Sequence, residues 1–172
     1  MNVPRGMVKI DGIGLADLPR IGLYATDTIA AGGHATVSDE PAARELEDGV
    51  LIVHGHSDLT ELDESMALTF GTRVVAVSNT ADLSTLAVSE GDGRRRHIVD
   101  ALEESHLETG QPLPEEEGHS RLTEESALAI FERLTGIGLG DLAASEFVIL
   151  RPVQEHDETE ERPFIKRLFG LH

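Results

Sequence analysis

The chain has 172 residues, enough for one hydrophobic core, and its 32 acidic and 14 basic side chains give a formal net charge of −18. This charge argues against a phosphate-binding surface and against nucleic-acid binding. There is no cysteine, hence no disulfide and no thiolate nucleophile, and no apolar run approaches the roughly 20 residues that a membrane-spanning helix needs. Because the N-terminus also lacks the apolar region of a secretion signal, we expect a cytoplasmic protein without membrane contact.

Short strand patterns dominate the first 55 residues. β-Branched and other apolar residues between turn signals predict strands, paired glycines predict a loop, and a short Ala/Leu-rich stretch predicts a helix. The predicted elements are a strand over 3–10, a helical turn over 15–20, a strand over 21–25, a loop over 27–33, a helix over 42–46 and a buried strand over 50–53.

The next element is a helix over residues 58–70. Asp58 is expected to cap it, Glu61 stands three residues later as in a capping box, and Gly71 can end it. Because this helix connects two strand patterns, residues 50–53 and 73–77 can form a parallel crossover pair, whereas the block that follows favours antiparallel neighbours.

Residues 71–100 read as a meander of three strands separated by turns. A valine run begins it, a second strand follows from Leu83, and a Gly-Asp-Gly turn leads to the third at His97. Together with the crossover pair, the pattern predicts an α+β fold with a mostly antiparallel, or mixed, sheet covered by two or three helices.

The following residues hold the clearest helix. Thr123 is expected to cap it, an apolar stripe runs through Leu128, Phe131 and Leu134, and Gly136 should end it. Around it we expect a strand over 101–109, a proline-spaced acidic loop over 111–118, a helical turn over 139–144 and a strand over 146–150.

One heptapeptide occurs twice, as GIGLADL from Gly12 and GIGLGDL from Gly136. The flanking residues differ, so the recurrence does not indicate a duplication, and neither copy has the spacing of a dinucleotide-binding loop. We expect each copy to end one element and begin a helical turn.

The C-terminal region changes in composition. Residues 1–152 are predicted to form a single α+β domain, residues 153–162 an acidic linker, and residues 163–172 a short amphipathic helix. The apolar side chains of that helix need a surface to cover, either on the same domain or on a partner protein. The candidate partner-binding residues are Phe164, Ile165, Leu168 and Phe169.

Three groups of residues are candidates for chemistry. His54 and His56 are two apart, so on a strand they would face the same way and could share a metal ion, with Asp58 or Asp63 within reach. No further histidine stands at ligand spacing. Paired carboxylates fit a solvated surface. In the run from Arg94 to Arg96, strand alternation should send Arg95 to one face and its two neighbours to the other. No residue is assigned a catalytic or cofactor-binding role, and no cofactor is expected.

Several segments together resemble a group of uncharacterised actinobacterial proteins that share a domain of unknown function. The matching stretches are GTRVVAVSN from Gly71, the Asp92-Gly93 turn, GQPLPE from Gly110 and ALAIFERLTG from Ala127. Unlike that pattern, this chain has no tryptophan. The resemblance implies an α+β domain and supplies no activity, and neighbouring small families suggest an immunity or antitoxin role.

The leading hypothesis is therefore a non-enzymatic, acidic protein-interaction module, such as an immunity or antitoxin-like neutraliser of a basic partner. One alternative is a small metal-dependent or hydrolytic enzyme centred on His54 and His56. Another is a nucleic-acid mimic. Self-association into a homo-oligomer stays open at this point.

Overall fold

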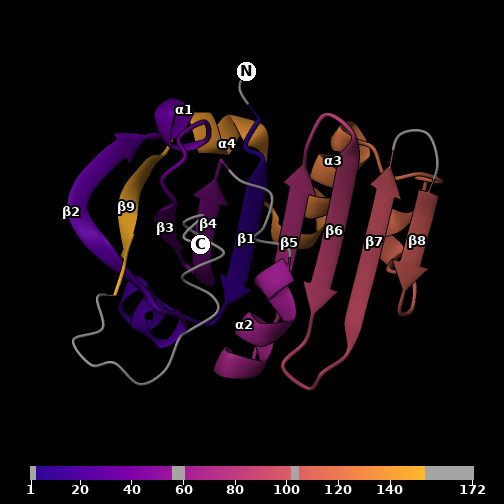
Figure 1. Cartoon of the computed structure of the whole chain (residues 1–172), viewed down its shortest axis with the longest axis horizontal. Helices are drawn as coiled ribbons and strands as arrows, with labels where there is room; N and C mark the ends of the chain where they lie inside the picture. The colour runs from indigo at the N-terminus through magenta and orange to yellow at the C-terminus, as the bar shows by residue number, and fades with distance from the viewer. Residues whose placement is uncertain (1–2, 56–60, 102–104, 154–172) are drawn as a thin grey trace.

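A nine-stranded sheet organises the computed structural model, which describes residues 3–55, 61–101 and 105–153 (Figure 1). The strand order is β2-β9-β3-β4-β1-β5-β6-β7-β8. The strands are β1 (Gly6–Asp11), β2 (Leu23–Ala31), β3 (Ala42–Leu46), β4 (Gly49–His54), β5 (Val74–Asn79), β6 (Leu83–Ser89), β7 (Arg95–Ala101), β8 (Ser105–Thr109) and β9 (Glu146–Pro152). The helices are η1 (Leu15–Ile21), α1 (Gly32–Ala35), α2 (Asp63–Phe70), η3 (Pro114–Glu116), α3 (Glu124–Thr135) and α4 (Leu139–Ala143).

Helices cover both faces of this sheet. Helix α2 and η1 pack on one face, and α3 and α4 pack on the other, so that Figure 1 shows α2 in front of the strands and α3 behind them. Strand residues alternate between the two cores: Met7 and Val53 face α3, whereas Val8 and Ile52 face α2. The interior is mainly aliphatic, and Phe131 and Phe147 are its largest fully buried side chains.

Local sequence signals are confirmed where neighbouring residues decide the structure. The meander appears as β5, β6 and β7, each antiparallel to the next, and β8 extends it. Helix α3 begins after Thr123, whose hydroxyl accepts from the backbone N–H of Ser126 at 3.1 Å, and ends at Gly136 with a φ of 74°. The α+β fold is therefore as expected.

The parallel pair that the sequence permits does not form. Strand β1 lies between β4 and β5 and is antiparallel to both. Strands β4 and β5 therefore run in the same direction but are not hydrogen-bonded to each other. Every strand pair among the described residues is antiparallel, and the sheet is not mixed. The N-terminal strand β1 thus separates the two strands that a parallel pair would have placed side by side.

Two other segments differ from prediction because sheet pairing overrides local preference. Residues 42–46 form strand β3 rather than a helix, since they pair with β4 on one side and β9 on the other. Strand β2 continues through most of the predicted loop at 27–33. A register shift between Ala25 and Ile29 lets it follow β9 to Ala31.

Helix α2 begins later than predicted. Its first residue is Asp63, and the two residues before it, Glu61 and Leu62, form a turn of 3-10 helix. The predicted capping box depends on Asp58, so it stays a prediction. Leu62 and Met66 are buried as expected. Asp58 and His56 lie outside the described residues, as do the predicted C-terminal helix and all but Val153 of the acidic linker. No helix in the described part is long and apolar enough to cross a membrane.

A close backbone approach joins α1 to the segment after α4. The backbone N–H of Gly32 donates to the Ser145 carbonyl at 2.7 Å, and a Cβ at Gly32 would lie 1.7 Å from the Leu142 carbonyl oxygen. We expect Gly32→Ala to lower the free energy of unfolding by about 2 to 3 kcal/mol, because backbone has to move. Gly33→Ala is the control, since no atom lies within 4 Å of its added Cβ. Equal urea midpoints for the two variants would contradict this expectation.

Candidate functional site

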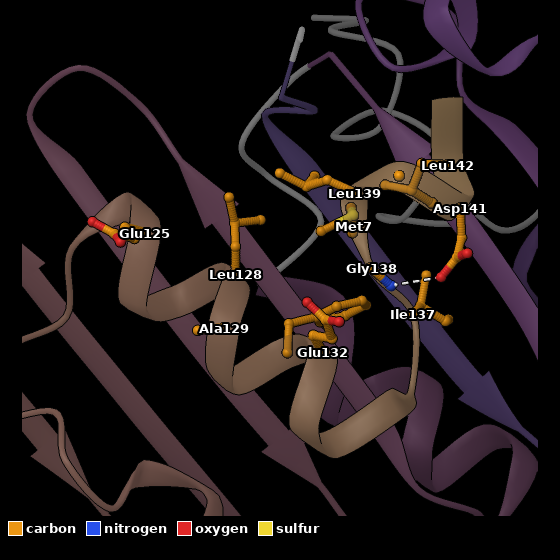
Figure 2. Close-up of a pocket in the computed structure, with 12 residues that line it drawn as sticks. Met7, Glu125, Leu128, Ala129, Glu132, Ile137, Gly138, Leu139, Asp141 and Leu142 are labelled. Carbon is orange, nitrogen blue, oxygen red and sulfur yellow. Dashed lines mark hydrogen bonds between the residues drawn. The ribbon is translucent and has the colours of Figure 1, made fainter. Parts of the chain in front are cut away.

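One candidate site is a groove of about 550 Å³ between α3 and α4, here called the α3–α4 groove. Leu128 and Ala129 of α3, Leu139 and Leu142 of α4, and Met7 of β1 line the groove. Figure 2 shows the Leu139 side chain extending from α4 toward Leu128 on α3. Met7 and Leu142 are buried, whereas Leu128, Ala129 and Leu139 are half-buried. The groove thus offers apolar side chains that are only partly buried within the described part of the chain, and its volume is in the size range of binding pockets.

The repeated heptapeptide shapes one wall of this groove. Gly136 ends α3 in the left-handed conformation, and the chain then turns into α4. The Asp141 carboxylate accepts from the backbone N–H of Gly138 at 3.1 Å, drawn as a dashed line in Figure 2. The first copy makes the same contact, from Gly14 N–H to Asp17 at 2.9 Å. The prediction that each copy begins a helical turn is confirmed.

Among the described residues, the charged side chains that line the groove are all acidic. Glu125 and Glu132 stand on α3 and Asp141 on α4, and all three are exposed. The nearby basic residue Arg133 does not neutralise them, because its Nη1 donates to the carbonyls of Glu115 and Glu117 at 2.9 Å each. An apolar floor with an acidic rim favours an apolar ligand that also carries positive charge.

A second group of charged residues lies at β7, here called the Arg96–Asp100 cluster and consisting of Arg96, Asp100, His106, Glu116 and Arg121. Arg96 and Asp100 point from β7 toward the α3 side of the sheet and are only 5% and 4% exposed. The cavity beside them is about 120 Å³, too small for a typical small-molecule ligand.

Within this cluster Arg96 binds the loop that precedes α3. Its Nε and Nη2 donate to the Glu116 carboxylate at 2.8 and 2.7 Å, and its Nη1 donates to the carbonyls of Thr109 and Gly110. The hydrogen bond to Glu116 raises the pKa of Arg96 above its usual range, with a further contribution from Glu108. Burial raises the pKa of Glu116, but the hydrogen bonds from Arg96 and the Leu113 N–H, together with the Arg96 charge, outweigh burial and lower the pKa overall. The guanidinium therefore anchors this loop.

Asp100 fixes the start of α3. Its carboxylate accepts from Arg121 Nε at 2.6 Å and from the backbone N–H of Leu122 at 3.0 Å, and it contacts His106 Nδ1 at 3.0 Å. The Arg121 hydrogen bond, helped by Leu122 and His106, holds the pKa of Asp100 well below its usual range. Since these groups already satisfy one another, we assign the cluster a structural role.

The sequence-predicted site residues are not brought into a described site. His54 ends β4 and is buried, while His56 lies outside the described residues. No group of three potential metal-ligating side chains occurs within residues 3–55, 61–101 and 105–153. The predicted partner-binding residues Phe164, Ile165, Leu168 and Phe169 also lie outside those ranges.

Arg95 and Arg96 lie on opposite faces of the sheet as predicted, but Arg94 precedes β7 and is not part of the strand. Arg95 faces α2 and binds Asp63 with Nε and Nη2 at 3.0 and 2.9 Å, whereas Arg96 faces the opposite side. Arg94 pairs with Asp92 in the exposed turn. All three pair with acidic side chains.

No family model matches the chain, and no curated protein or solved structure matches it either. The resemblance to actinobacterial proteins of unknown function stays a prediction. The candidate site therefore rests on its own geometry. Sequence reasoning missed the groove, although the apolar residues left over in GIGLGDL were a signal that α4 could expose a surface.

Proposed function

We propose that this protein is a non-enzymatic interaction module whose α3–α4 groove binds a basic, amphipathic segment of a partner protein. The observation that carries the proposal is the combination of half-buried apolar residues with a rim that is acidic only. Apolar contact would supply most of the binding energy, and the rim would select for lysine or arginine beside the apolar side chains.

The charge of the whole chain supports the same role. A net charge of −18 attracts basic partners over distance and accelerates their association at low ionic strength. An immunity or antitoxin-like neutraliser of a cationic protein would use both effects. A nucleic-acid mimic would use the long-range charge but would not need an apolar groove.

A set of labelled synthetic peptides tests the proposal by fluorescence anisotropy. We expect a Leu/Lys peptide with helical spacing to bind, and the matched Leu/Glu peptide not to bind, because the rim repels acidic groups. Binding should weaken with salt but persist. A Gly/Lys peptide of equal charge that bound equally well would favour the nucleic-acid mimic instead.

Rim variants locate the binding surface. Glu125→Gln combined with Glu132→Gln should weaken Leu/Lys peptide binding by roughly threefold to tenfold, because two exposed charge pairs are lost. The control is Glu64→Gln with Glu124→Gln, which removes the same charge from the first turns of α2 and α3 but outside the groove lining. Equal weakening in both double variants would contradict binding at the groove.

A further inference from the structure

We propose that residues 162–172 of this chain occupy the α3–α4 groove and compete there with a partner. The composition of this segment and the length of the chain that leads to it support its docking in the groove. The competition with a partner additionally rests on the proposed function.

The segment has the composition that the groove favours. Residues 162–172 contain no acidic residue and three basic ones, in a chain with a net charge of −18. The basic residues stand between large apolar side chains, namely Phe164, Ile165, Leu168, Phe169 and Leu171. An acidic rim around an apolar floor complements both properties at once.

The register of the sheet places the groove within reach of the segment. Met7, Val53, Ala42 and Ile149 lie in one row across β1, β4, β3 and β9. Three steps between strands cover about 14 Å, and the four residues from Ile149 to Val153 cover about 13 Å, which places Val153 about 20 Å from Met7. The ten residue steps from Val153 to Pro163 can span about 33 Å. The chain is therefore long enough to bring its own basic segment to the groove floor.

Other exposed apolar residues among those described offer less. Leu68, Leu107, Tyr24 and Ile29 are exposed large apolar side chains, but they lie on separate elements, α2 and β8, and on two parts of the edge strand β2. The α3–α4 groove instead gathers its apolar residues around one hollow.

A single tryptophan reports the docking. The chain has no tryptophan, so Phe169→Trp in the full-length protein gives one emission signal. We expect that emission to be shifted to shorter wavelength and to resist acrylamide quenching severalfold relative to the free peptide. Adding Gly140→Arg should reverse both effects, because the new cation enters the groove lining, where a Cβ meets no atom within 4 Å.

A second groove variant and a control outside the groove accompany this test. Ala129→Arg places the same cation on the α3 wall and should act like Gly140→Arg, whereas Ala143→Arg on α4 lies outside the groove lining and should leave the emission unchanged. A solvent-exposed tryptophan in the Phe169→Trp protein, or a buried one that both groove variants leave untouched, would overturn the docking.

Peptide titration separates the two proposals. In full-length protein carrying Ile165→Asp and Leu168→Asp, the Leu/Lys peptide should bind several times more tightly than to the parent, because its competitor is disabled. Unchanged affinity, together with an exposed tryptophan in the Phe169→Trp protein, would end the docking proposal and leave the proposed function standing. A groove-bound tryptophan with no peptide binding even to the double variant would end the proposed function alone.

Discussion

Replacing Asp63 by alanine should lower the free energy of unfolding by about 3 kcal/mol, because it leaves Arg95 without its buried partner. The Asp63 side chain is 0% exposed, and both carboxylate oxygens are bound by Arg95. Ser89 also donates to this carboxylate. The loss should lie at the lower end of the range for buried pairs, because Arg95 keeps 26% exposure and can regain some hydration.

The neighbouring arginine gives the control for this prediction. Arg94 and Asp92 form a pair of the same type, but their side chains are 79% and 57% exposed. Arg94→Ala should therefore hardly change the urea midpoint, since exposed ion pairs contribute little. If Asp63→Ala and Arg94→Ala unfold at the same urea concentration, the buried pair does not hold α2 to β7.

The same residues explain how far sequence reasoning reaches in this fold. The Thr123 cap and the meander from Val74 could be predicted because the deciding residues are neighbours in the chain. Alternation along β7 likewise predicted that Arg95 and Arg96 would face opposite sides. Alternation could not predict the ion-pair partner of each arginine, because Asp63 lies on α2 and Glu116 on η3.

The errors arise where distant segments decide the outcome. Residues 42–46 have the alanine and leucine content of a helix, yet they become β3 because β4 and β9 leave a place between them. The insertion of β1 between β4 and β5 is of the same kind, because no local pattern marks a central strand's neighbours. The α3–α4 groove was missed for the same reason, as Met7 reaches it from the N-terminal strand.

Replacing Asp100 by asparagine should lower the free energy of unfolding at pH 7 by about 2 to 3 kcal/mol, because charge-assisted hydrogen bonds to a buried carboxylate are lost. Asp100 joins β7 to the segment before α3 through Arg121 and the Leu122 N–H. The variant should therefore loosen the start of α3, where Glu125 lines the groove. Amide hydrogen exchange would show this as faster exchange at Leu122 in the variant than in the wild type, with residues of β5 unchanged.

The pH dependence identifies the charge as the cause. Because the folded pKa of Asp100 is lowered, its contribution is complete above the unfolded value of about 3.9 and is lost as the pH falls below it. The stability difference between wild type and Asp100→Asn should thus be constant from about pH 7 to 5 and shrink from about pH 4 toward pH 2. Urea unfolding at each pH measures this difference, with Asp92→Asn in the exposed turn as the control. A difference that stayed constant down to pH 2 would mean that packing, rather than the ionised carboxylate, holds α3 to β7.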